Sequence, residues 1–187
     1  DWSSDVCSSD LIGLSVYNDD VKADNPIRFQ IAKTDAEAMY SLAAKLDHFK
    51  RPLEAPVKVA FMGTKCFRWE NGNDATETKF NYTQDEDARV LLDYFERISE
   101  TETRFIDLER AMRFDRLGVN QSLIELQIVY DRKRLMAPEQ FVPLLKRIVK
   151  NEMILHMARE RAAGLMDSFE KQKVAAAAPA PPPAPTP

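Results

Sequence analysis

The stretch CFRWENGNDATETKFNYT, residues 66–83, decides the fold of this chain. Aromatic and polar side chains alternate in it with a period of two, which is typical of β-strands with one buried face. The aromatic positions are Phe67, Trp69, Phe80 and Tyr82. Asn71 and Gly72 lie between the two runs and favour a turn, because both residues tolerate positive φ. We predict a β-hairpin with a longer or bulged connection over residues 71–75, whose aromatic face other elements must cover.

Two further alternating runs, 12–16 and 27–31, precede the hairpin and predict a pair of antiparallel strands. Residues 34–37, Thr-Asp-Ala-Glu, have the pattern of a capping box and predict the start of a helix. A second box at 83–86 predicts another helix directly after the hairpin. Residues 12–99 therefore predict an α+β domain, in which an antiparallel sheet of about four strands is covered by two helices.

From residue 100 onward the apolar residues follow helical spacing only. They predict one helix that ends near Gly118, a second that Asn120 caps, and a third from Pro138 to about Lys173. We expect a helical hairpin or a three-helix extension over 100–173, packed on the α+β domain. The final segment, 174–187, holds six of the eleven prolines and predicts a disordered tail rich in alanine and proline.

The first residues, DWSSDVCSSDL, resemble the in-frame translation of a sequencing adapter. We interpret residues 1–11 as non-native and exclude them from the fold prediction. They contain Cys7 and three aspartates, so the net charge of −4 becomes −1 and Cys66 is left as the single cysteine. No disulfide within the chain is then expected. The chain also lacks an initiator Met, so we expect a truncated N-terminus and the loss of any export signal.

The remaining sequence resembles uncharacterised bacterial proteins in the order of its elements. The pattern is a strand, a capped helix that ends in LDHFKRP (46–52), the strand entry MGTKCFRW (62–69), a hairpin and a second capped helix. This resemblance implies no activity and no site residue.

Several classes of function lack their motifs in this sequence. Five glycines and no glycine-rich loop argue against a phosphate-binding or dinucleotide-binding site. Two histidines and one natural cysteine are too few for a structural zinc site. The near-neutral charge gives no general attraction to nucleic acid, and no apolar run approaches the ~20 residues of a membrane-spanning helix. We expect no cofactor, no metal, no nucleic-acid partner and no transmembrane segment.

Cys66 and His48 are the thiol and imidazole that could form a nucleophilic pair, if the end of the first helix meets the start of the hairpin. A single cysteine beside a strand is more often a small packing residue. Cys66 and His48 are therefore weak catalytic candidates, and we favour a structural role for both.

Four arginines near predicted helix ends are the candidate binding residues: Arg113, Arg116, Arg132 and Arg134. A guanidinium cluster binds phosphate or carboxylate groups, although neighbouring acidic residues offer internal pairing instead. We predict a non-catalytic binding or protein-interaction module with an unknown protein partner or acidic ligand, and we favour an exported or periplasmic location in a bacterium. The alternative is a small hydrolase or thiol enzyme that uses Cys66. The oligomeric state is left open.

Overall fold

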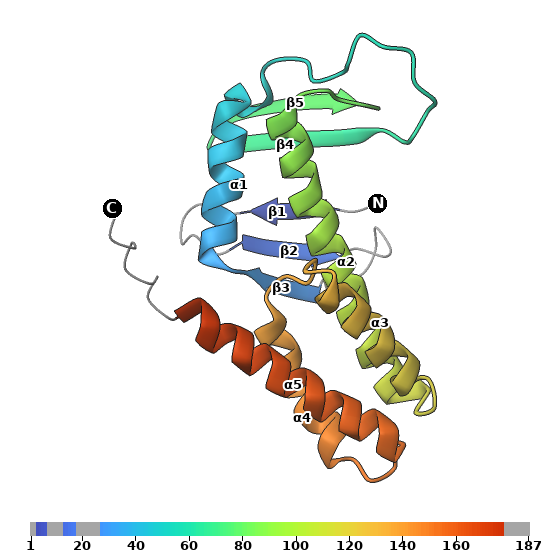
Figure 1. Cartoon of the computed structure of the whole chain (residues 1–187). Coiled ribbons are helices and arrows are strands. Elements are labelled where there is room, and N and C mark those ends of the chain that lie inside the picture. The colour runs from blue at the N-terminus through green and yellow to red at the C-terminus, as the bar shows by residue number, and fades with distance from the viewer. Residues whose placement is uncertain (1–2, 7–12, 18–26, 178–187) are drawn as a thin grey trace, which may run out of the picture. The chain divides into compact units, whose positions relative to one another are not determined.

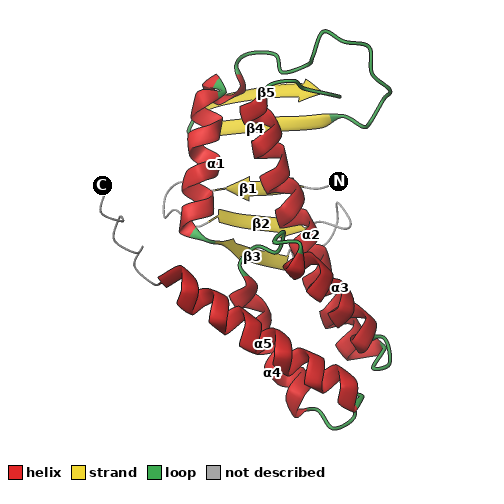
Figure 2. Cartoon of the chain, viewed as in Figure 1, coloured by secondary structure: helices red, strands yellow, loops and turns green. Residues whose placement is uncertain are grey.

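The computed structural model describes residues 3–6, 13–17 and 27–177 of the 187-residue chain. The chain divides into two compact units, Asp1–Glu102 and Thr103–Pro187, and the boundary falls within the long helix α2 (Glu86–Phe114). The fold class is α+β with mostly helical content, as Figure 2 shows by colour. The two units are described separately below.

The first unit contains a three-stranded antiparallel sheet in the order β1-β2-β3 (Figure 1). The strands are β1 (Ser3–Val6), β2 (Gly13–Tyr17) and β3 (Ile27–Ile31). The pairing of β2 with β3 agrees with the sequence analysis. Strand β1 was not predicted, because it falls in the excluded segment 1–11. Strand β1 pairs with the edge of β2 through backbone hydrogen bonds, and such bonds do not depend on which side chains the strand carries.

A separate two-stranded sheet is formed by β4 (Lys65–Asn71) and β5 (Asp74–Phe80). The predicted hairpin is therefore present, but the prediction of one sheet of about four strands is wrong. The described strands form two sheets that share no ladder. Alternation of apolar and polar residues indicates which face of a strand is buried, whereas it does not indicate which strands pair.

The turn of the hairpin is shorter than predicted. Asn71 lies opposite Asp74 in the register, so only Gly72 and Asn73 form the connection. The φ angle of Gly72 is 61°, which suits the first central position of a type II′ turn, where glycine is favoured. The prediction of a longer or bulged connection over residues 71–75 is therefore wrong.

Helix α1 (Lys33–Lys45) and the first half of α2 run across one face of this hairpin (Figure 1). The centre of the contact is Phe67, whose side chain is only 4% exposed. Its ring lies 5.2 Å from that of Phe49, 5.1 Å from that of Phe80 and 5.8 Å from that of Phe95, measured between centroids. Phe95 of α2 thus contacts the aromatic face at Phe67, and Tyr40 of α1 contacts it at Trp69.

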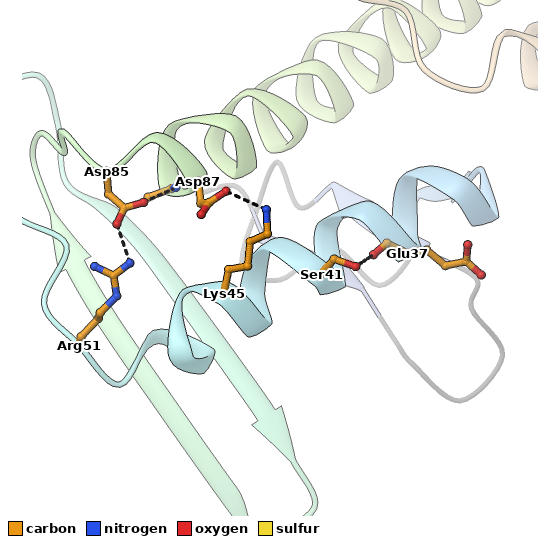
Figure 3. A network of polar contacts seen from close by, with 7 residues as sticks. Glu37, Ser41, Lys45, Arg51, Asp85 and Asp87 are labelled. Atoms are coloured by element: carbon orange, nitrogen blue, oxygen red, sulfur yellow. Dashed lines mark hydrogen bonds and ion pairs between the residues drawn. The ribbon is translucent and has the colours of Figure 1, made fainter.

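Polar contacts tie the end of α1 and the turn after it to the start of α2 (Figure 3). The Lys45 ammonium lies 3.3 Å from the Asp87 carboxylate, and the Arg51 guanidinium lies 2.6 Å from the Asp85 carboxylate. Acidic residues are favourable here, because the first turn of a helix has free N–H groups and a positive dipole end. These pairs fix where α2 begins relative to α1.

The two predicted capping boxes differ from the observed helix starts. The Ala88 N–H donates to Asp85 Oδ1 at 3.1 Å, so Asp85 rather than Thr83 caps α2. Helix α1 begins at Lys33, and its N-cap Ala32 makes no side-chain hydrogen bond. A threonine followed by a glutamate is a frequent cap, but tertiary contacts decide which turn becomes helical.

The secondary structure in the described residues of the second unit is all helical. It holds the end of α2, α3 (Val119–Asp131), the short 3₁₀ helix η2 (Pro138–Phe141), α4 (Val142–Lys150) and α5 (His156–Ala177). Apolar side chains from these elements form one core, with Leu108, Leu123, Phe141, Leu145, Ile148 and Ala162 among its members.

The helix boundaries of this unit differ from the prediction in four places. Helix α2 is one helix of 29 residues, and α3 begins at Val119 without a cap from Asn120. The run from Pro138 breaks at Asn151, whose Oδ1 accepts a hydrogen bond from the Met153 N–H at 3.1 Å and ends α4. Helix α5 continues to Ala177 and so overlaps the predicted tail, 174–187, whose residues 178–187 lie outside the described part.

Candidate functional site

Cys66 and His48 lie on opposite faces of the β-hairpin. Cys66 is exposed and stands opposite Lys79 in the register, on the face that carries charged residues. The His48 ring packs against Trp69 on the covered face, with the ring centroids 4.6 Å apart. Since neighbouring residues of a strand point to opposite faces, the thiol at position 66 is directed away from the imidazole. The structure does not bring the predicted thiol–imidazole pair together.

The surroundings of Cys66 disfavour its thiolate form. Partial loss of contact with water and the nearby carboxylate of Glu77 raise the pKa of the Cys66 thiol, although its side chain is still exposed. Glu77 itself accepts a hydrogen bond from Lys79, which lowers the pKa of that carboxyl group, and the two charged groups lie 2.8 Å apart. Because the thiolate is the nucleophile, a raised thiol pKa reduces reactivity near neutral pH. The geometry therefore gives no support to the thiol-enzyme alternative.

His48 belongs to a turn of unusual backbone geometry, η1 (Asp47–Phe49). The φ angles of its three residues are 52°, 50° and 63°, in the left-handed region that costs non-glycine residues roughly 1–2 kcal/mol each. Phe49 is buried, and the His48 carbonyl accepts a hydrogen bond from the Thr76 hydroxyl. Packing and this bond hold the turn, so the position of His48 has a structural explanation.

The four candidate arginines form two separate pairs. Arg113 and Arg116 lie just before α3, whereas Arg132 and Arg134 follow its last residue. Helix α3 has 13 residues, so its ends are about 20 Å apart at ~1.5 Å per residue. The structure does not place the four guanidinium groups in one cluster, and a surface that uses all four together has no geometric support.

Arg132 and Arg134 surround the C-terminal cap of α3. Lys133 has a φ of 57°, and its N–H donates to the Tyr130 carbonyl at 2.8 Å. The Arg134 N–H donates to the Val129 carbonyl at 3.1 Å. These two bonds are those of a Schellman motif, which satisfies the last carbonyl groups of a helix. The backbone of this segment thus has a structural role.

Arg113 and Arg116 lie beside two highly exposed apolar side chains. Phe114 is 82% exposed and Leu117 is 74% exposed. We name the four residues Arg113, Phe114, Arg116 and Leu117 the α2–α3 tip. The sequence analysis selected the arginines and missed the apolar pair, because helical spacing alone does not show where a helix ends and its last residues become exposed.

A short turn with well-defined hydrogen bonds supports the α2–α3 tip. The Asp115 N–H donates to the Ala111 carbonyl at 2.8 Å and continues the last turn of α2. The Gly118 N–H then donates to Asp115 Oδ1 at 3.0 Å. A Cβ at position 118 would lie 2.2 Å from Asp115 Oδ2, so any other residue there requires the Asp115 carboxylate to move. The tip residues are therefore presented by a defined turn.

The charge of the α2–α3 tip is positive. Arg113 lies 2.6 Å from Glu109, yet its side chain is 60% exposed. Within the part of the chain that the structure describes, Arg116 makes no ion pair, and Asp115 Oδ1 accepts the hydrogen bond from the Gly118 N–H. An exposed guanidinium beside an exposed aromatic ring can bind a carboxylate while the ring is buried against an apolar surface.

A second feature is a polar groove of about 550 Å³ between α3 and α5. Its lining comprises Gln127, Tyr130, Asp131, Met157, Glu160, Arg161, Gly164, Leu165 and Ser168. None of these residues was a candidate in the sequence analysis, because they are ordinary helix-surface types brought together only by the packing of α5 on α3.

Neither a metal cluster nor a membrane helix is found among the residues that the structure describes. No group of three or more His, Cys, Asp or Glu side chains is placed to hold a metal ion there. No described helix is both long and apolar enough to cross a membrane.

Comparison of this chain with protein-family models, with curated proteins and with solved structures gave no match. The candidate sites therefore depend on the geometry and chemistry of this chain alone.

Proposed function

We propose that this protein is a protein-interaction module and that the α2–α3 tip is its binding surface. The observation that carries the proposal is the exposure of Phe114 and Leu117 between two arginines, on a turn fixed by Asp115 and Gly118. Exposed apolar side chains that lie together and are rimmed by polar residues are typical of protein–protein interaction sites.

The composition of the tip matches that of energetically dominant interface residues. Aromatic residues and arginine are enriched among the side chains that contribute most to protein–protein affinity. Full burial of an exposed Phe side chain contributes about 1.5–3 kcal/mol from apolar surface alone. Phe114 can supply such a term, because 82% of its surface is accessible in the isolated chain.

The partner surface that fits the tip is acidic with an apolar pocket. Arg113 and Arg116 provide guanidinium groups that bind carboxylates in a bidentate manner. Long-range attraction between opposite charges also speeds association and weakens as salt is added. We therefore infer an acidic protein segment with at least one aromatic or aliphatic residue as the ligand.

The experiment is a selection from a random peptide library displayed on phage, with the whole chain as the immobilised target. Enriched peptides should combine several Asp or Glu residues with a large apolar residue. A parallel selection on the Phe114→Ser, Arg116→Ala variant should lose these peptides. Enrichment of neutral or basic peptides, or the same acidic peptides on both targets, would remove the tip as the binding surface.

A further inference from the structure

Side-chain hydrogen bonds join α3 and α5 along the groove. Arg161 Nη1 donates to Gln127 Oε1 at 2.8 Å, and its Nε donates to Asn120 Oδ1 at 3.4 Å. The Tyr130 hydroxyl donates to the Ser168 carbonyl at 3.0 Å. Residues that line the groove therefore also hold the two helices together.

Arg161 is a partly buried cation whose described partners are both neutral. Side-chain amides of Gln127 and Asn120 orient the guanidinium, but neither neutralises it. A partly desolvated charge without an opposite charge is unfavourable, so a carboxylate that entered the groove would be stabilised there. The held orientation reduces the entropy that a ligand would otherwise lose in ordering this side chain.

Gly164 lines the groove at an exposed position of α5. Glycine in the interior of a helix is less favourable than alanine, because it loses more backbone freedom on folding. A Cβ at position 164 would meet no atom within 4 Å, so the packing of the described residues does not require glycine there. The space beside Gly164 is therefore open to a bound molecule.

We propose that this groove binds a small organic carboxylate, with its anionic group on Arg161 and its apolar part beside Gly164. Met157 and Leu165 line the same groove and provide apolar contact surface. The volume of about 550 Å³ lies within the range of small-molecule sites, roughly 300–1,000 Å³. This site is separate from the α2–α3 tip, since the two share no residue.

Two carboxylates also line the groove and define the competing outcome. Glu160 lies 3.5 Å from the exposed His156, one turn toward the start of α5. Asp131 is exposed at the last residue of α3, one turn beyond Gln127. If these groups dominate the field of the groove, a cation will bind in place of an anion.

The experiment is an NMR titration of the ¹⁵N-labelled full chain with benzoate, and separately with benzylammonium, which has a similar shape and the opposite charge. Benzoate should give saturable shifts at backbone amides of residues 127–131 and 157–168. Arg161→Gln should weaken benzoate binding at least tenfold, and Arg161→Lys several-fold, because lysine keeps the charge without the planar fork. Binding of benzylammonium but not benzoate at these amides overturns the proposal.

Gly164→Ala separates binding from folding, because it should increase the stability of the fold and decrease the affinity for benzoate. The alanine variant should raise Tm by about 1–4 °C through helix propensity and lower benzoate affinity at least fivefold, because its methyl group occupies the space assigned to the benzoate ring. If Arg161→Gln is poorly folded, the affinity of Gly164→Ala for benzoate still tests the proposed site. A Gly164→Ala variant that binds benzoate as tightly as the parent contradicts the proposed site.

Discussion

The Asp115 carboxylate accepts a hydrogen bond from the Gly118 backbone N–H, with Oδ1 and N 3.0 Å apart. This bond closes the turn between α2 and α3 and leaves the side chains of Phe114 and Leu117 exposed on it. The proposed binding surface is thus defined by a local backbone feature.

Replacement of Gly118 tests this turn. In Gly118→Ala the new Cβ would lie 2.2 Å from Asp115 Oδ2, so the carboxylate must rotate away and the bond is lost. We expect a decrease of about 0.5–2 kcal/mol in the free energy of unfolding, as for a lost helix cap. Chemical denaturation measures it. The double variant Asp115→Ala, Gly118→Ala should be little less stable than Gly118→Ala, because both changes remove the same hydrogen bond. If the two losses in the free energy of unfolding add fully, the bond contributes nothing to stability.

Phe67 is the central residue of the hairpin core. Phe67→Ala should lower the free energy of unfolding by about 3–5 kcal/mol, because it removes ring contacts with Phe49, Phe80 and Phe95. Trp69→Ala should cost less, since Trp69 is only partly buried against Tyr40 and His48. Denaturant melts of both variants rank the two positions. A larger loss for Trp69→Ala would contradict the assignment of Phe67 as the centre.

Asp85 should make the stability of the first unit depend on acid pH. Burial alone would raise the pKa of Asp85, but the Ala88 N–H and the Arg51 guanidinium outweigh it and lower that pKa. A carboxyl group with a lowered folded-state pKa contributes stability above its unfolded value of ~4, and the contribution is lost as pH falls through the folded value. The difference between the parent and Asp85→Asn should therefore be about 0.5–2 kcal/mol from pH 5 to 8 and shrink below pH ~4.

Thermal or denaturant melts at several pH values measure this difference. Arg51→Ala should show a smaller dependence on acid pH than the parent, because one of the groups that lower the Asp85 pKa is gone. A difference between the parent and Asp85→Asn that stays constant down to pH 2 would contradict the assigned role of Asp85.

The thiol of Cys66 should alkylate slowly near neutral pH despite its exposure. Burial and Glu77 raise its pKa, so the thiolate fraction at pH 7 is below that of a free cysteine. Glu77→Gln should increase the rate of reaction with iodoacetamide, and His48→Ala should leave it unchanged. A rate that falls in His48→Ala would show that imidazole and thiol do interact, and would revive the thiol-enzyme alternative.

The parts of the fold that follow local patterns were predictable from sequence. Alternation placed Phe67 and Phe80 on one buried face, and the structure confirms the hairpin. The number of sheets was not predictable, because strand pairing depends on contacts distant in sequence. The break at Asn151 was missed, since a side-chain hydrogen bond to the Met153 N–H competes with the helix without changing the apolar spacing.

The candidate sites show the same limit. Arginine content pointed to Arg113 and Arg116, but their separation from Arg132 and Arg134 depends on the length and direction of α3. The exposure of Phe114 could not be predicted without knowing that α2 ends at this residue. The groove beside Gly164 depends on the packing of two helices, and its residues carry no sequence motif.

The most direct test of the interaction surface is the affinity of one selected acidic peptide for matched variants, measured by fluorescence anisotropy. Phe114→Ser and Phe61→Ser make the same change at residues that are 82% and 78% exposed, in different units of the chain. We predict that Phe114→Ser weakens binding at least tenfold with an unchanged melt, whereas Phe61→Ser binds like the parent. Equal binding by the parent and Phe114→Ser would contradict the proposed role of the α2–α3 tip.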